Sequence, residues 1–167
     1  MLFNTASTPL NHFIFGNDKF EIWKDEISNH HSLFSVVDFQ PGNIVCEFGA
    51  AAILPSPSAL TVQVGINEHI YLQPGVLQYI NHSCSPNIFF DLVTFKAICL
   101  RPINKGDELF YFYPSTEWEM AEPFQCLCGS VECLGYIGGA SYLSEDILKR
   151  YRFSDFISEQ INKKYSK

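Results

Sequence analysis

Hydrophobic positions along this chain form short runs that Pro, Gly, Asn and Asp residues interrupt, and this pattern predicts a strand-rich fold. The turn-rich segments QPGN at residues 40–43 and NKGD at residues 104–107 are expected to form tight turns. Residues 75–80, GVLQYI, could form a strand or a single helical turn. The expected strands span residues 13–15, 19–23, 32–38, 44–48, 60–64, 69–72, 88–91, 95–100 and 108–112.

Helical periodicity is confined to the C-terminal part of the chain. The stretch SEDILKRYRFSDFISEQINKK begins at Ser144, which suits a helix N-cap, and acidic residues follow it in the first turn. The middle of the chain has no helix long enough for a βαβ crossover, so a doubly wound parallel sheet is excluded. The predicted fold class is therefore mainly β with short helices and a helical C-terminal tail.

The composition describes a globular domain with an acidic balance. The chain has 167 residues, of which 47% are hydrophobic and 17% charged, and this size suits one domain with a real core. The net charge of −7 disfavours direct binding to a phosphate backbone. An acidic surface fits a basic partner, such as a lysine- and arginine-rich peptide, although such a surface can also serve solubility alone.

Cysteine usage raises the first question about chemistry. The N-terminal sequence MLFNTASTPLNHF lacks the basic start of a signal peptide, and no long apolar run predicts a membrane span. The expected location is therefore intracellular, in the cytoplasm or the nucleus, where disulfides are rare. The chain nevertheless has six cysteines, three of them within CLCGSVEC, residues 126–133. The oligomeric state is left open by the sequence.

The cysteine cluster has the spacing of a metal site, C-x-C-x4-C. Cys126, Cys128 and Cys133 supply three sulfur ligands, whereas structural zinc sites use four Cys or His ligands. Candidates for the fourth ligand are Cys46, Cys99, the histidines and Cys84, which lies in a polar turn and is the best placed. The alternative is three free thiols near a loop. A site completed by Cys84 would tie the C-terminal tail to the NHSCSPN motif around it.

Three motifs, in this order, resemble those of the SET-domain family of protein lysine methyltransferases. NHSCSPN, residues 81–87, resembles N-H-S-C-x-P-N, and GDELFYFY, residues 106–113, resembles G-E-E-L-x-x-x-Y. CLCGSVECLG, residues 126–135, resembles the zinc-binding segment that follows the domain in this family. The stretch 33–48 bears a weaker similarity to the first hairpin of the domain.

The resemblance implies a fold, a cofactor and a set of site residues. The family fold consists of short β-sheets around a knot-like crossing, and it binds S-adenosylmethionine on one face and the substrate lysine on the other. The implied domains are an N-terminal extension (1–19), the SET domain (20–120), the zinc segment (121–139) and the helical tail (140–167). The implied residues are Asn81, His82 and Tyr136 for the cofactor, Tyr113 and Tyr111 for the catalytic channel, and Cys84, Cys126, Cys128 and Cys133 for structural zinc.

The expected reaction needs alignment more than acid–base strength. Methyl transfer is an in-line displacement at a sulfonium methyl group, and the attacking amine must be neutral. A free lysine has a pKa of about 10.4, and a channel that excludes water beside the cofactor's positive charge favours its neutral form. The Tyr113 hydroxyl and backbone carbonyls can orient the amine, and Tyr111 can influence how many methyl groups are added.

Two departures from the family pattern keep other functions open. The family's G-x-G before the first hairpin corresponds to His30, His31 and Ser32, so a SET-like binding module without catalysis is one alternative. The usual middle insertion that helps to select the substrate is also missing. The leading prediction is methylation of a lysine side chain in a basic protein or peptide. The alternative enzymatic hypothesis is methylation of a free amino acid or another small amine.

Overall fold

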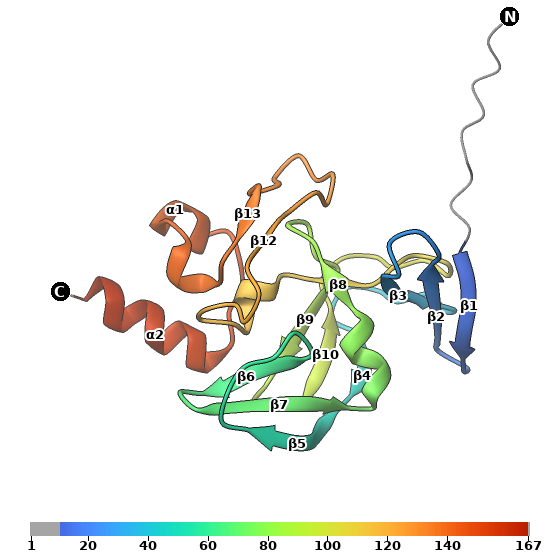
Figure 1. Cartoon of the computed structure of the whole chain (residues 1–167), viewed down its shortest axis with the longest axis horizontal. Helices are drawn as coiled ribbons and strands as arrows, with labels where there is room; N and C mark the ends of the chain where they lie inside the picture. Colours follow the sequence, from blue (N-terminus) through green and yellow to red (C-terminus); the bar gives the residue numbers. More distant parts are fainter. Residues whose placement is uncertain (1–10, 167) are drawn as a thin grey trace, which may run out of the picture.

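The computed structural model describes residues 11–166, which fold into four small β-sheets and a short helical C-terminal segment (Figure 1). The predicted fold class, mainly β with short helices, is confirmed. An N-terminal antiparallel sheet has the strand order β1-β2-β3. Its strands are β1 (Asn11–Gly16), β2 (Phe20–Asp25) and β3 (His31–Ser35).

The central sheet carries the site and has the strand order β4-β10-β9-β11-β8. The strands β4, β10 and β9 pair antiparallel, but β11 pairs parallel with both β8 and β9. The short strand β11 therefore lies between the two strands that the loop 83–87 connects. The strands are β4 (Ile44–Glu47), β8 (Asn81–His82), β9 (Ile88–Asp91), β10 (Lys96–Cys99) and β11 (Phe110–Tyr111).

A third sheet, with the order β5-β7-β6, packs beside the central one, and β12 and β13 form a two-stranded ribbon (Figure 1). The sequence pattern missed β5 because GAAAIL lacks β-branched and aromatic residues, apart from Ile53. Pairing with β7 supplies the hydrogen bonds that its composition does not predict. The strands are β5 (Gly49–Leu54), β6 (Thr61–Gly65), β7 (Glu68–Gln73), β12 (Phe124–Gln125) and β13 (Tyr136–Ile137).

Two α-helices form the tail, α1 (Glu145–Leu148) and α2 (Asp155–Tyr165). Ser144 holds the expected N-cap position of α1 but makes no side-chain cap bond, whereas Ser154 accepts a hydrogen bond from the Ile157 N–H at the start of α2. Between the helices, the Tyr151 ring stacks on Phe112 with a centroid distance of 3.7 Å. This stacking places the segment between the two helices against the residue that follows β11.

Short 3-10 helices complete the secondary structure. The segment GVLQYI, left open between strand and helical turn, forms the 3-10 helix η1 (Gly75–Tyr79). The other two are η2 (Tyr113–Ser115) and η3 (Ala140–Tyr142). No helix among residues 11–166 has the length and apolar character needed to cross a membrane.

The main core lies between the N-terminal sheet, the central sheet and η1. Its fully buried members come from all three, for example Leu33, Leu77 and Phe90. A smaller cluster joins Cys84 and Cys126 to Ile137, and another joins Phe112 to Leu143 and Leu148 in the tail. The tail is thus packed against Phe112, which lies between the predicted catalytic residues Tyr111 and Tyr113.

Candidate active site

Two asparagines attach the ends of the NHSCSPN motif to β11 and its approach. Asn87 accepts a hydrogen bond from the Phe110 N–H at 2.8 Å through Oδ1 and donates to the Glu108 carbonyl at 2.9 Å. Asn87 is 2% exposed, so these bonds replace water for a buried amide. The hydrogen bonds of Asn87 therefore fix the loop 83–87 to β11, which lies between β8 and β9.

Asn81 attaches the other end of the motif to β3. Its Nδ2 lies within hydrogen-bond distance of the His31 carbonyl (2.9 Å), Ser32 Oγ (3.0 Å) and Glu108 Oε1 (3.0 Å). The amide nitrogen is thus occupied by the protein, which leaves Oδ1 as the side-chain group that could face a ligand. The predicted cofactor role of Asn81 stays a prediction, and the structure adds a positioning role for residues 31–32.

His82 links the motif to Tyr113 and to the cysteine cluster. Its Nδ1 accepts the backbone N–H of Tyr113 at 3.2 Å, so in the neutral ring the proton is on Nε2. Nε2 lies 3.4 Å from the Cys84 sulfur and can donate to it. Burial lowers the pKa of His82 to about 4, which keeps the ring neutral near pH 7.

Tyr111 and Tyr113 lie side by side, as their alternation in the sequence predicts. Their ring centroids are 4.6 Å apart, although β11 ends at Tyr111 and Tyr113 begins η2. The Tyr113 hydroxyl donates to the Ile80 carbonyl at 3.4 Å. Burial raises the pKa of Tyr113 to about 12 and raises that of Tyr111 as well, so both hydroxyls keep their protons at neutral pH.

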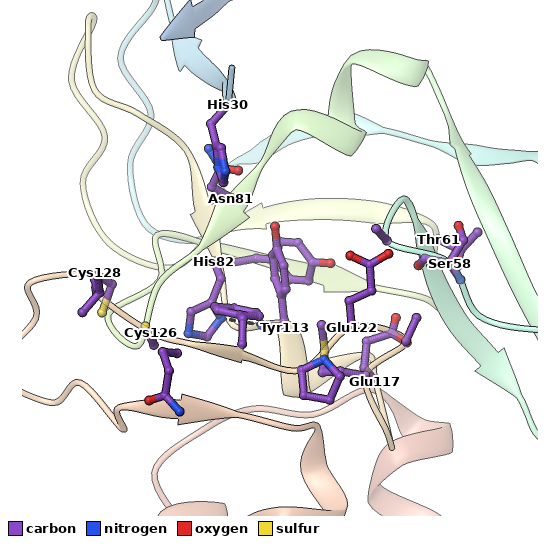
Figure 2. Close-up of a pocket in the computed structure, with 18 residues that line it drawn as sticks. His30, Ser58, Thr61, Asn81, His82, Tyr113, Glu117, Glu122, Cys126 and Cys128 are labelled. Carbon is purple, nitrogen blue, oxygen red and sulfur yellow. Dashed lines mark hydrogen bonds between the residues drawn. The ribbon is translucent and has the colours of Figure 1, made fainter. Parts of the chain in front are cut away.

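A cavity of about 550 Å³ connects these residues (Figure 2). Asn81, His82 and the segment 124–128 line one part of it, and Ser58, Thr61 and Glu117 line another. Figure 2 shows Tyr113 between the labelled cysteines on one side and Glu117 on the other. Tyr113 thus lies between two sets of lining residues, which suits two ligands that meet beside it.

The four predicted metal ligands come together in space. Their sulfur atoms lie within 4.8 Å of one another, with Cys84 and Cys126 3.9 Å apart. Tetrahedral zinc with Zn–S bonds of about 2.3 Å requires sulfur atoms about 3.8 Å apart. The donor set and its spacing therefore fit zinc, and Cys84 lies in one group of four sulfur atoms with Cys126, Cys128 and Cys133.

The surroundings of the cluster also suit a bound cation. Burial raises the pKa of Cys84 to about 11 and raises that of Cys126, so without a metal these thiols hold their protons. The Leu134 N–H and His82 Nε2 point at the Cys84 sulfur, both at 3.4 Å, and such donors stabilise a thiolate. Metal binding here would release protons and favour the folded tail.

The remaining cysteines lie apart from this cluster, as the sequence pattern indicates. The Cys46 thiol donates to the Glu47 carbonyl at 3.0 Å, and the Cys99 thiol donates to the Arg101 carbonyl at 2.9 Å. Burial raises the pKa of both thiols, which makes them unreactive near pH 7. Neither belongs to the group of sulfur atoms that could hold a metal.

Among the residues predicted for the cofactor and the channel, Tyr136 alone does not line the cavity. It lies on β13, its side chain is 42% exposed, and its ring packs near Tyr142 at 6.1 Å. Its cofactor role stays a prediction without support from this geometry. In the other direction, the sequence patterns did not single out Glu117, whereas the structure buries it to 4% exposure in the cavity wall. Its place shortly after the tyrosine motif was the only available signal.

Comparison with known proteins now identifies the family. Residues 30–114 match the SET domain family. The chain is 39% identical over 127 residues to Methyltransferase flvH of Aspergillus flavus, an alignment that covers 75% of this chain and 71% of that protein. The chain therefore belongs to the SET-domain family of methyltransferases, as the three motifs indicate.

Histone-directed enzymes match over a shorter region. The chain is 34% identical over 70 residues to the histone-lysine N-methyltransferase, H3 lysine-4 specific, of Emericella nidulans, and 38% identical over 76 residues to human histone-lysine N-methyltransferase 2D. These alignments cover 38% and 40% of this chain but 6% and 1% of the relatives. The similarity to those enzymes therefore covers only a small part of their length.

Proposed function

We propose that this chain transfers a methyl group from S-adenosylmethionine to the side-chain amine of a protein lysine. The observation that carries the proposal is the single cavity in which the Asn81–His82 pair and the Tyr111–Tyr113 pair meet. SET-domain methyltransferases use S-adenosylmethionine, and the family membership extends that cofactor to this chain. The acceptor class is the finer part of the proposal.

Each part of the cavity has a task in this reaction. The part next to Asn81, His82 and the segment 124–128 is assigned to the cofactor, which supplies a sulfonium methyl group. The part next to Thr61 and Glu117 is assigned to the acceptor amine. The Tyr113 hydroxyl and the Ile80 carbonyl, 3.4 Å apart, orient the amine at the point where the two parts meet. Buried tyrosines also exclude water, which favours the neutral amine.

The cysteine cluster is assigned to structural zinc. Cys84, Cys126, Cys128 and Cys133 would hold the ion with no open position for a substrate, as closed four-cysteine sites do. Through His82, the ion would stabilise the backbone position of Tyr113. We also infer that the family's knot-like crossing is kept, which the position of β11 between β8 and β9 supports.

A free amino acid or another small amine is the second candidate acceptor. Methyltransferase flvH, which is similar to 75% of this chain, has a name that specifies no protein substrate, whereas the two histone-directed relatives match 38% and 40% of this chain. The segment between β4 and β7 is also short, so little of the chain is available to bind a peptide on either side of the acceptor.

The departure from G-x-G has a structural counterpart. His30 lines the cavity, and the His31 ring packs on Tyr79 with a centroid distance of 5.1 Å. The imidazole of His31 is therefore turned toward η1, and the cavity stays open beside it. This arrangement favours a functional cofactor site over the alternative of a silent binding module.

An assay with a labelled methyl donor separates the two acceptor classes. The purified chain is incubated with labelled S-adenosylmethionine and, in parallel, with mixed basic proteins, free lysine and other small amines. Label in a basic protein, lost in Tyr113→Phe, supports protein-lysine methylation. Label confined to small amines would move the function to the second candidate, and no transfer to any amine would contradict both.

A further inference from the structure

Glu117 is a buried carboxyl group that the assigned tasks of the cavity do not use. It follows η2 directly, it is 4% exposed, and it lines the same cavity as Tyr111 and Tyr113. Buried carboxyl groups usually have a cationic partner, because isolated burial of the charge is costly. Among residues 11–166, no salt bridge includes Glu117, and no Lys or Arg lines the cavity.

The position of Glu117 is fixed by hydrogen bonds from two directions. Its Oε1 accepts the Gln63 N–H from β6 at 3.0 Å, and its backbone carbonyl accepts the Ala140 N–H at 2.8 Å. Gln63 Oε1 in turn accepts the Trp118 N–H at 3.0 Å. The Thr116 side chain also lies within hydrogen-bonding reach of the Glu117 carboxyl group. A rigidly held carboxyl group therefore stands in the wall of the cavity.

The reaction creates a need for such a group. An alkylamine is an ammonium ion at neutral pH, and it can attack the methyl group only after it loses a proton. We propose that the Glu117 carboxylate binds the acceptor ammonium and takes this proton. The proposal rests on the proposed methyltransferase function and holds for either class of acceptor, because both present an ammonium group.

The proton and electron balance is complete with the groups at hand. The ammonium gives its proton to Glu117, which becomes a neutral carboxylic acid, and the amine keeps its lone pair. The lone pair then forms the new N–C bond to the methyl group while the C–S bond breaks and its electron pair goes to sulfur. The products are a methylated ammonium, neutral S-adenosylhomocysteine and protonated Glu117, which releases its proton to solvent.

The electrostatics of the wall suit a proton acceptor. Burial raises the pKa of Glu117 to about 8, near the value at which a general base works best around neutral pH. The titratable groups that face the same cavity are Tyr111 and Tyr113 from the β11 segment, His30, His82, Glu122, Cys126 and Cys128. The tyrosines and His82 are neutral at pH 7, and Glu122 is exposed, so Glu117 is the buried carboxyl group that faces the amine. Its carboxylate is the major form only above about pH 8.

The first test compares a charged probe with a neutral one. Binding of n-butylamine and n-butanol is measured by calorimetry for wild type, Glu117→Gln and the matched control Glu119→Gln, with and without S-adenosylhomocysteine. Glu119 is exposed and does not line the cavity, and glutamine at position 117 can still accept the Gln63 N–H. We expect wild type and Glu119→Gln to prefer the amine at least about tenfold, since each tenfold is about 1.4 kcal/mol, and Glu117→Gln to lose this preference.

An equal amine preference in wild type and Glu117→Gln would overturn the proposal. Binding of S-adenosylhomocysteine is measured in the same titrations, so a failure of the proposed cofactor site is seen separately. A second measurement needs no variant: the infrared absorption of protonated carboxyl groups is recorded in wild type at pH 9. It should grow when n-butylamine is added and stay unchanged with n-butanol, and no growth with the amine would also overturn the proposal.

Discussion

At the scale of single residues, three side chains of the NHSCSPN motif form hydrogen bonds to neighbouring elements. Asn81 binds β3 and Glu108, Asn87 binds β11, and His82 bridges the Tyr113 N–H and Cys84. The motif therefore assembles the walls of the cavity in addition to any direct ligand contact. This double role explains why short polar residues interrupt a hydrophobic domain there.

Removal of the Tyr113 hydroxyl should reduce methyl transfer. Tyr113→Phe keeps the ring that packs on Tyr111 at 4.6 Å but loses the hydroxyl near the Ile80 carbonyl. We expect turnover to fall at least about tenfold, which corresponds to about 1.4 kcal/mol of transition-state stabilisation. Steady-state rates with labelled S-adenosylmethionine measure this, and a rate equal to wild type would exclude a catalytic role for the hydroxyl.

Tyr111 should control the number of methyl groups added. Its side chain is 8% exposed and lines the cavity, so Tyr111→Phe leaves more room beside the acceptor nitrogen. We expect the variant to remain active and to give more highly methylated product. Mass spectrometry of the product decides this, and an unchanged methylation state would show that the Tyr111 hydroxyl serves packing alone.

The pH dependence should follow the ionisation of Glu117. Its pKa is raised to about 8, and the carboxylate is the form that accepts a proton, so activity should be lost as the pH falls below about 8. In wild type, kcat/KM for the amine should rise to about pH 8 and then level off. In Glu117→Gln it should be lower at pH 7 and rise further toward the amine pKa of about 10.4. Parallel profiles for the two proteins would contradict this expectation.

At the scale of elements, the tail packs closely on the backbone of the site segment at Gly139. Gly139 has φ of 111°, and a Cβ built on it would lie 2.5 Å from the Trp118 carbonyl oxygen. The following Ala140 N–H donates to the Glu117 carbonyl. The contact between η3 and the segment 117–119 therefore requires a close backbone approach that only glycine permits.

Gly139→Ala should consequently destabilise the fold by at least about 2 kcal/mol, because it adds left-handed strain and a backbone clash. Gly49→Ala is the matched control, since a Cβ there meets nothing within 4 Å. The control should be neutral or stabilising by up to about 1 kcal/mol. Chemical denaturation of both variants measures the difference, and equal stabilities would show that the tail does not depend on this approach.

Sequence patterns predicted some elements well and others poorly, for physical reasons. Strands with alternating β-branched and aromatic residues, such as β2 and β7, were found, and so were the glycine turns at Gly42 and Gly106, both with positive φ. The Ala-rich strand β5 was missed because its partner β7 stabilises it. Strand β11 is shorter than the expected strand 108–112, because Glu108 pairs instead with Phe34 of β3 in an isolated bridge.

At the scale of the whole molecule, the sequence predicted only those residues of the candidate site that belong to recognisable motifs. Cysteine spacing and the resemblance located Cys84, Cys126, Cys128 and Cys133, whose sulfur atoms do come together. Glu117 could not be predicted, because its burial depends on β6 lying across the segment after η2. The cofactor role assigned to Tyr136 came from the family resemblance alone, and the Tyr136 side chain lies outside the cavity.

Loss of the metal site should destabilise both the C-terminal tail and the cavity. Cys84→Ser removes the one ligand that comes from the central part of the chain, and we expect a large loss of bound zinc and a lower melting temperature. Cys46→Ser, in a cysteine apart from the cluster, is the control. Metal analysis with thermal melting measures both effects. Full zinc retention in Cys84→Ser would mean that another residue is the fourth ligand.

The central functional assignment is that S-adenosylmethionine binds in the cavity beside Asn81. A calorimetric titration of the chain with S-adenosylmethionine tests this without any knowledge of the acceptor. We expect one cofactor per chain for wild type, and loss of binding in Asn81→Ala, which gives up contacts to His31, Ser32 and Glu108 while the domain stays folded by circular dichroism. No heat of binding with the zinc-loaded wild-type chain, or an unchanged affinity in Asn81→Ala, would contradict the assignment of this cavity to the cofactor.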